Sequence, residues 1–386
     1  MSVPAIVLDA RWVSSSPSGI GRYTLSILRE FASDPGPFRF EILCGAAELP
    51  FIASRCGLPA GGTDRFRFHP LARGPFSPRG QFDAARIARA TGAAVFHSTN
   101  FMLPLPLLAA PRGRRPKLVA NLHDLIPLAH PEFTPHAKKT RFFPVYRALM
   151  RFIASRGDAF VTASRSAADD IRRLLSVPPE KIHVAVDGVD ARFRPLAGPK
   201  PSASGAPHRI LYVGRSDPYK NLPHLIDVFA RAAAFGLPAD TTLDIAGEPD
   251  PRYPEAPARV RALGLEGKVR FLGFIGDDEL LRAYQEADAL ALLSRYEGFG
   301  LPVLEAMACG TPVVCADAAS LPEVAGDAAL LVPPDDTDEA AKALASLLAD
   351  RALAARLAAA GLAQAARFTW AASARGLLET YDSLLR

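Results

Sequence analysis

The sequence predicts an α/β protein made of two doubly wound domains. Its 386 residues exceed what one hydrophobic core usually organises, so two domains are expected. Short apolar runs alternate with segments of helical periodicity along nearly the whole chain, which is typical of βαβ units and parallel sheets. A stretch rich in Pro, Gly, Ser and Ala at 192–209 interrupts this alternation and is typical of an interdomain linker.

The predicted strands form two series, one on each side of the linker. Strands of the first series are expected at 5–10, 40–45, 93–98, 117–124, 159–164 and 181–186. Strands of the second series are expected at 209–214, 242–247, 269–274, 289–294, 312–317 and 329–334. The predicted parts are a first domain at 1–192, a linker at 193–208, a second domain at 209–368 and a last helix at 369–386 that packs back on the first domain. Ligand groups should collect where the strands end, facing a cleft between the domains.

Composition excludes several classes of protein. Hydrophobic residues make up 49% of the chain, so a disordered protein is not expected. The four cysteines lack CxxC spacing, which argues against a zinc or disulfide framework and favours a reducing compartment. The first residues show no signal-peptide pattern, and the apolar run at 101–111 is too short and too rich in proline for a membrane span.

The net charge of +5 suits an anionic substrate, a membrane surface or a nucleic acid. No helix-turn-helix, RNP or zinc-finger pattern is present, so no nucleic-acid partner is expected. The basic segments 111–117 and 136–156, the second predicted as one helix, are candidates for contact with an anionic membrane. A solvated basic face over a core stripe is the alternative. We expect a cytoplasmic location, with or without peripheral contact to the inner face of the cytoplasmic membrane.

Two cations follow the first strand of the second domain. The segment "YVGRSDPYKN" places Arg215 and Lys220 after the strand and next to the start of a helix. Two positive side chains near a helix N-terminus suit a diphosphate. The alternative is a solvated turn with ordinary surface cations.

Two carboxylates lie in the apolar segment "SRYEGFGLPVLEAMACGT" at 294–311. Glu297 should lie in a loop at a strand end, and Glu305 should lie in the helix that follows. Carboxylates accept hydrogen bonds from the neighbouring hydroxyls of sugars and riboses. The alternatives are a helix-capping role for Glu297 and a buried salt bridge for Glu305.

Polar residues also follow strands of the first domain. Candidate site residues at the rim formed by these strand ends are Asp9, Arg11, His97, Asn100 and Asp124. His123 lies at the same kind of position, although a lone histidine there is often structural. The segment "SGIGRY" (18–23) opens a helix and either binds an anion through its backbone or forms a simple tight turn. The DxD at 336–338 is expected to start a helix, so no metal site and no cofactor are predicted.

Taken together, these motifs resemble retaining glycosyltransferase family 4, whose fold is GT-B. The resemblance covers nearly the whole chain and is most specific at 294–336, where Glu297 and Glu305 match the E-x7-E region. The segments "GIGRY", "HDLIPLAHPEF", "VTASRSAADDI" and "YVGRSDPYKN" match in order and position. The resemblance therefore implies a GT-B fold of two Rossmann-like domains.

The family also implies roles for matched residues. Glu297 would bind hydroxyls of the donor sugar, Glu305 would bind the ribose, and Arg215 with Lys220 would hold the diphosphate. His123 would lie beside the donor sugar and is counted, with Glu297, Arg215 and Lys220, among the catalytic residues. Further donor contacts are implied for Gly19, Gly21, Gly298, Phe299, Gly300 and Leu301, and the segment Gly273, Phe274 and Ile275 would meet the base. The acceptor side would include Asp9, Arg11, His97, Asn100 and Asp124.

The implied activity is that of a retaining hexosyltransferase. It uses a nucleotide sugar and needs neither a metal nor a cofactor. The motifs look most like bacterial mannosyltransferases of polysaccharide assembly, which implies GDP-mannose as donor and a saccharide or polyprenyl-diphosphate-linked acceptor. Alternatives are a UDP-sugar donor, a phosphorylase-like enzyme with pyridoxal phosphate, and a catalytically silent nucleotide-sugar-binding or assembly protein.

Overall fold

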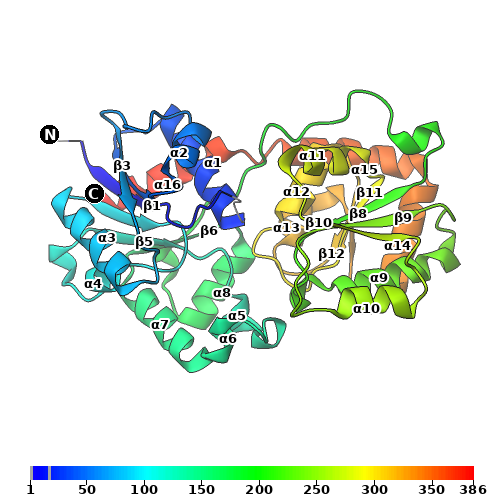
Figure 1. Ribbon diagram of the computed structural model, residues 1–386, viewed down its shortest axis with the longest axis horizontal. Helices are drawn as coiled ribbons and strands as arrows, with labels where there is room; N and C mark the ends of the chain where they lie inside the picture. The colour runs from blue at the N-terminus through cyan, green and yellow to red at the C-terminus, as the bar shows by residue number, and fades with distance from the viewer. Residues whose placement is uncertain (1–2, 16–18) are drawn as a thin grey trace. The chain divides into compact units, whose positions relative to one another are not determined.

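The computed structural model describes residues 3–15 and 19–386, so Ser18 of the glycine segment lies outside the described residues. The chain forms two compact units, which are coloured by residue number in Figure 1. The first unit contains Met1–Leu125, Phe142–Gly188 and Trp370–Arg386. The second unit contains Ile126–Arg141 and Val189–Thr369.

A parallel sheet forms the centre of the first unit, with strand order β3-β2-β1-β4-β5-β6-β7. Its central strand β1 is buried along its whole length, as expected for a strand covered on both faces. The strands are β1 (Ala5–Asp9), β2 (Arg39–Gly45), β3 (Phe66–Leu71), β4 (Val95–Ser98), β5 (Lys117–Asn121), β6 (Ala159–Thr162) and β7 (Ile182–Val184). The helices are α1 (Gly19–Ser33), α2 (Leu49–Arg55), α3 (Pro78–Ala90), α4 (Leu105–Leu108), α7 (Phe143–Arg156), α8 (Arg165–Leu175) and α16 (Trp370–Leu385).

The second unit contains another parallel sheet, with strand order β10-β9-β8-β11-β12-β13. Its strands are β8 (Arg209–Val213), β9 (Thr242–Ala246), β10 (Val269–Gly273), β11 (Ala289–Leu292), β12 (Val313–Ala316) and β13 (Leu330–Val332). Its helices are α5 (Ile126–Ala129), α6 (Lys138–Arg141), α9 (Leu222–Ala232), α10 (Glu255–Ala262), α11 (Asp277–Glu286), α12 (Leu301–Ala308), α13 (Leu321–Ala325), α14 (Thr337–Ala349) and α15 (Arg351–Ala365). The two parallel sheets confirm the predicted fold class of two doubly wound domains.

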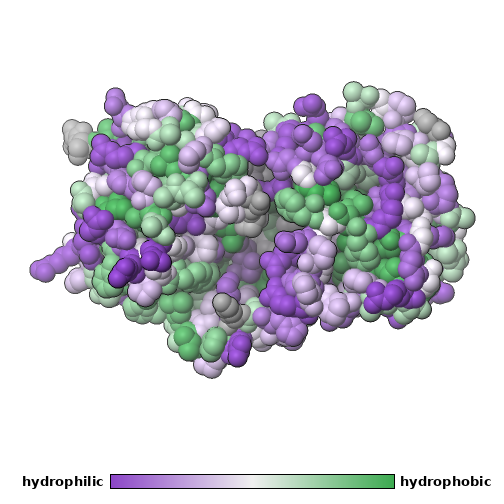
Figure 2. Space-filling view, viewed as in Figure 1, coloured by the Kyte–Doolittle hydropathy of each residue, from purple (hydrophilic) through white to green (hydrophobic). Residues whose placement is uncertain are grey.

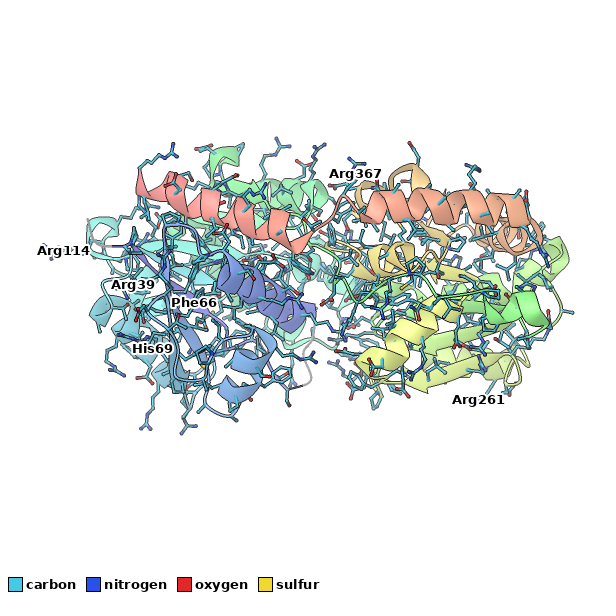
Figure 3. The ribbon with its side chains drawn as sticks, turned by 90° about the horizontal axis from the view of Figure 1, so that it is seen from above. Arg39, Phe66, His69, Arg114, Arg261 and Arg367 are labelled. Atoms are coloured by element: carbon cyan, nitrogen blue, oxygen red, sulfur yellow. The ribbon has the colours of Figure 1, made fainter. Side chains whose placement is uncertain are left out.

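The last helix, α16, completes the core of the first unit. It packs against α1, and Trp370, Leu377 and Tyr381 join the same buried cluster as Ile27 and Phe31. Figure 3 shows this helix and α1 from above. The apolar side of an amphipathic helix is therefore buried against a unit whose other segments lie far away in the sequence.

The sequence analysis missed strand β3. Its six residues, FRFHPL, contain Pro70 and are mostly half-exposed or exposed. Proline is confined to sheet edges, and β3 is the edge strand next to β2. An edge strand of mixed polarity does not produce the continuous apolar run that identified the other strands.

The units differ from the predicted boundaries at residues 126–141 and at 189–192, which both belong to the second unit. Residues 126–141 group with the second unit, where the His130 ring lies 5.8 Å from Tyr296 and the His136 ring 5.3 Å from Tyr253. The single helix predicted at 136–156 is two helices, α6 and α7, because Pro144 starts a new helix just after Phe142.

The stretch predicted as a linker, 193–208, packs on the second unit. The Phe193 ring stands edge-on to Tyr284 at 5.6 Å, and Gln285 Nε2 donates to Arg194 O at 2.8 Å. Its first residues are therefore anchored on the second unit. In the described part of the chain, no helix combines the length and apolarity needed to cross a membrane.

Candidate functional site

An ion pair joins two strand ends of the second unit. Lys220 Nζ lies 2.8 Å from Glu297 Oε1 and 2.9 Å from Oε2. Lys220 ends the short 3-10 turn Pro218–Lys220 after β8, and Glu297 lies in the loop after β11. Because β8 and β11 are neighbours in the parallel sheet, residues 77 positions apart meet at one edge. The structure thus brings together two of the four predicted catalytic residues.

Serines fix the loop that carries Glu297. Ser294 Oγ donates to Glu297 Oε1 at 2.7 Å. Ser320 Oγ lies 2.8 Å from Glu297 O and 2.7 Å from Phe299 O. A residue outside the loop therefore fixes the loop backbone. The carboxylate is 8% exposed, which leaves it buried but hydrogen-bonded. Sequence reasoning missed Ser320 because nothing in the local pattern connects it to a loop more than twenty residues earlier.

The two glycines of this loop, Gly298 and Gly300, differ in backbone conformation and in burial. Gly300 has φ 116° and precedes the first residue of α12, Leu301; a Cβ on it would lie 2.8 Å from Leu321 Cδ2. Gly298 is half-buried, whereas the Phe299 ring is buried against Phe368 at 5.9 Å. Any ligand contact of Phe299 would therefore come from its backbone.

Glu305 lies inside α12 and is also buried. Tyr284 Oη donates to Glu305 Oε2 at 2.7 Å, and Thr311 Oγ1 donates to Tyr284 O at 2.6 Å. This chain of hydrogen bonds fixes the orientation of the carboxylate. Tyr284 and Thr311 were not singled out from the sequence, because a tyrosine on a helix face gives no signal of the carboxylate that it orients.

Arg215 is the exposed member of the predicted phosphate pair. Its side chain is 63% exposed, and Nε lies 2.8 Å from Asp217 Oδ2. Tyr212 Oη donates to Arg215 O at 2.7 Å and so holds the backbone at this strand end. Arg215 can therefore reorient toward a ligand, while Lys220 is held by Glu297.

The backbones just after β8 and β9 lie in close contact, at the strand end that carries Arg215. A Cβ on Gly247, just after β9, would lie 1.8 Å from Gly214 O. We expect Gly247→Ala to separate the ends of β8 and β9, with a loss of about 1–3 kcal/mol of stability and weaker nucleotide binding. Thermal unfolding and a nucleotide titration measure both effects. Gly267→Ala is the matched control, because nothing lies within 4 Å of its added Cβ. Equal behaviour of the two variants would contradict this prediction.

The predicted base-contacting segment ends the edge strand β10. Gly273 has φ 68°, and the Phe274 side chain is 66% exposed. Ile275 is half-buried. An exposed aromatic ring at a strand end offers a surface on which a base can stack. The DxD at 336–338 begins a helix, as expected, since Asp336 caps α14 by accepting from Glu339 N at 2.9 Å.

In the first unit, His123 follows β5 and contacts the helix that the glycine segment opens. Its Nε2 lies 2.9 Å from Thr99 O, and its ring is edge-on to Tyr23 at 4.9 Å. Because a carbonyl oxygen accepts, Nε2 carries the proton. Burial lowers the pKa of His123, so the neutral ring is favoured. Gly19 and Gly21 lie in the first turn of the same helix, α1.

Three predicted acceptor-side residues make buried contacts within the first unit. Arg11 pairs with Asp9 through Nε to Oδ1 at 2.8 Å and Nη2 to Oδ2 at 2.6 Å, with both side chains buried. His97 is fully buried; its Nδ1 meets Tyr381 Oη and its Nε2 meets Asn121 Oδ1. Burial lowers the pKa of His97 to about 4. We therefore leave these three residues out of the proposed site.

The other two acceptor-side candidates remain at the surface of the strand ends. Asn100 is half-buried, and its Oδ1 accepts from Phe101 N at 2.7 Å. Asp124 is exposed and directly follows His123. Sequence reasoning also missed Asp187, a buried carboxyl group after β7 whose Oδ1 has no hydrogen-bond partner within the described part of the chain.

Family comparisons cover both units. Residues 17–193 match the model described as Glycosyltransferase Family 4, and residues 199–364 match the model described as Glycosyl transferases group 1. The chain is 28% identical over 381 residues to O-antigen chain mannosyltransferase B of Escherichia coli, covering 92% of this chain and 93% of that protein. It is 29% identical to the serotype-specific mannosyltransferase WbdA of Escherichia coli, where 99% of this chain matches 48% of that protein, so it spans about half of WbdA.

Another relative is a D-inositol 3-phosphate glycosyltransferase of Nocardia farcinica, 34% identical over 67% of this chain and 62% of that protein.

Solved structures share the fold. Sucrose-phosphate synthase from Thermosynechococcus elongatus has a TM-score of 0.77 at 22% identity, with 99% of each chain covered. Anabaena HepE in complex with UDP has a TM-score of 0.74 at 20% identity, covering 98% of this chain and 100% of that chain.

Proposed function

Because the chain is a glycosyltransferase of the family 4 type with the GT-B fold, we propose that it transfers mannose from GDP-mannose to a saccharide or lipid-linked saccharide, with retention of configuration. That it is a hexosyltransferase follows from its family. The donor is proposed because two mannosyltransferase relatives match more than nine-tenths of the chain. The acceptor is proposed because one of these relatives is named for an O-antigen chain.

The observation that carries the proposal is the Lys220–Glu297 pair after two adjacent strands. We assign Lys220 and Arg215 to the diphosphate of the donor, next to the N-terminus of α12. Charge develops on that diphosphate as the glycosidic bond breaks, and preorganised cations and backbone N–H groups stabilise it. Glu297 both orients Lys220 and offers acceptor oxygens to sugar hydroxyls.

Glu305 is assigned to the ribose hydroxyls, and its orientation by Tyr284 supports this role. The two oxygens of a carboxylate can accept several hydrogen bonds, so Glu305 can serve Tyr284 and a ribose hydroxyl together. The exposed Phe274 ring is assigned to stacking on the base. The same set of contacts suits GDP or UDP, so these residues support a nucleotide diphosphate sugar without selecting the base.

We assign front-face attack as the chemical step. The acceptor hydroxyl oxygen bonds to the anomeric carbon on the side from which the diphosphate leaves, and its proton passes to a phosphate oxygen. Retention follows because attack and departure share one face. His123 keeps its proton on Nε2, which bonds to Thr99 O, so its Nδ1 is available as a hydrogen-bond acceptor.

We also place the reaction in the cytoplasm. All four cysteines, Cys44, Cys56, Cys309 and Cys315, are buried free thiols. Free thiols are typical of proteins in a reducing compartment.

A donor panel tests the proposal. We expect GDP-mannose to raise the unfolding temperature, since a ligand at one hundred times its Kd adds about 2.7 kcal/mol to the native state. Mannose transfer to a saccharide acceptor should follow, and analysis of the product gives the anomeric configuration. Stabilisation and transfer with a UDP-sugar alone would overturn the proposed donor. Tight binding without transfer to any acceptor of a saccharide panel would overturn the proposed reaction.

A further inference from the structure

Helix α7 of the first unit leaves a row of large apolar side chains exposed. Phe142 is 58% exposed, Val145 68% and Phe152 40%, and Leu149 between them is half-buried. With their spacing of three, four and three residues, these side chains fall within roughly 80° of the helix surface over about 15 Å. The adjoining side of the helix, with Tyr146, Met150 and Ile153, is buried in the unit. We call Phe142, Val145, Leu149 and Phe152 the α7 stripe.

Cations flank the α7 stripe. Arg147 and Arg151 are exposed on the other flank of the outward-facing arc, one helical turn apart. No Asp or Glu occurs from 133 to 157. Apolar and basic groups thus share one solvent-facing surface, and in Figure 2 hydrophobic residues gather over α7 with hydrophilic ones beside them.

More cations lie at the C-terminal end of α7. The turn Arg112–Arg114 is fastened there, since Arg112 Nη2 donates to Ser155 O at 2.9 Å and Arg115 Nη2 donates to Arg156 O at 2.8 Å. Arg112 and Arg115 also pair with Asp158. Arg114 projects away from the ribbon at the edge of the unit (Figure 3), and Lys117 is exposed.

Four of these cations have no carboxylate within ion-pair distance. They are Arg114, Lys117, Arg147 and Arg151, and the carboxylates compared are those of residues 3–15 and 19–386. Exposed cations without carboxylate partners favour an anionic surface, and each contributes about 1 kcal/mol to binding at an anionic bilayer.

We infer that the α7 stripe and its flanking cations dock the first unit onto an anionic lipid bilayer. Phe142, Val145, Leu149 and Phe152 enter the boundary between headgroups and acyl chains. Arg147 and Arg151 extend to lipid phosphates, with their aliphatic stems on the apolar surface. The inference does not depend on which nucleotide sugar the enzyme uses.

Two other partners fit the same surface less well. A symmetric contact with a second copy would bring Arg147 and Arg151 of both copies together, and their like charges would repel. A nucleic acid would satisfy the cations, but exposed aliphatic side chains such as Val145 gain nothing from a phosphate backbone. A bilayer alone supplies both an apolar layer and a dense array of negative charge.

Sedimentation of the full-length chain with vesicles tests this inference. We expect binding to vesicles of equimolar phosphatidylglycerol and phosphatidylcholine, at least about tenfold weaker binding to phosphatidylcholine alone, and a loss of binding as salt rises. Val145→Glu with Phe152→Glu should lower the affinity by about tenfold or more, because charges replace the two inserted side chains. Arg147→Gln with Arg151→Gln should lower it by a similar factor and weaken the salt dependence.

The matched control is Phe82→Glu with Arg86→Gln on α3, where Phe82 is 66% exposed and Arg86 is exposed in the same unit. This control should bind vesicles as the unaltered chain does, and all variants should keep their circular dichroism. Absence of binding to anionic vesicles, or equal binding by the α7 variants, would overturn the inference. A dimer in light scattering that Val145→Glu with Phe152→Glu converts to a monomer would overturn it in favour of a contact between copies. Failure of donor binding would leave the vesicle result unchanged, so the two proposals are tested separately.

Discussion

Replacing Lys220 with alanine is expected to lower kcat by roughly 10²–10³-fold, because a preorganised charge at the leaving diphosphate is lost. Glu297→Gln should cause a loss of similar size, since the amide cannot hold Lys220 with two charged oxygens 2.8 and 2.9 Å away. Steady-state kinetics with saturating donor measure both variants. A KM effect without a kcat effect would indicate ground-state binding alone and would contradict the assignment.

Lower activity of the Lys220 and Glu297 variants can result from unfolding as well as from a slower chemical step. Lys220→Ala leaves Glu297 buried without its cation, which lowers stability as well as activity. The double variant Lys220→Met with Glu297→Gln removes both charges and keeps the volume, so it should fold yet remain inactive. Lys268→Ala is the matched control, because this exposed lysine lies in the same unit. Full activity of the double variant would exclude the pair from the reaction.

Asp187→Asn is expected to stabilise the chain at neutral and alkaline pH. Asp187 is buried, and burial raises its pKa from 3.8 to about 7. The folded state therefore holds the proton more tightly than the unfolded state. The stabilising effect of that proton is complete below the unfolded pKa and disappears as pH rises through about 7.

Asparagine keeps the shape and lacks the charge, so the variant should escape this loss. We expect the unaltered chain to lose on the order of 2–4 kcal/mol between about pH 4 and about pH 8 relative to Asp187→Asn. Denaturant unfolding of both proteins across this range measures the difference. Asp64→Asn, at an exposed position, is the control. Parallel pH profiles for Asp187→Asn and the unaltered chain would contradict the prediction.

The sequence predicts the sheets well because buried parallel strands are continuous apolar runs. Strand β3 escapes this signal since it lies at an edge and contains Pro70. The site was predicted only in part. Glu297 and Lys220 follow strands, and that position alone predicts that they share an edge of the sheet.

Side-chain partners are harder to predict than positions. Asp9 and Arg11 follow a strand as Glu297 does, yet they neutralise each other in the interior. The sequence predicts His97 and His123 at strand ends, but His97 lies within β4, where Tyr381 and Asn121 enclose it. The contact between His97 and Tyr381 joins residues 284 positions apart, which no local pattern reveals.

The position of α16 has a consequence for how the protein is made. The bond between His97 and Tyr381 spans 284 residues, and the segment Val189–Thr369 of the second unit is synthesised in between. At about 5–20 residues per second, the ribosome needs roughly 10–40 s for that segment. The unit whose synthesis starts first is therefore completed last. Until α16 emerges, the apolar surface around Phe31 and Phe38 lacks its cover, so a nascent chain depends on shielding by chaperones during that interval.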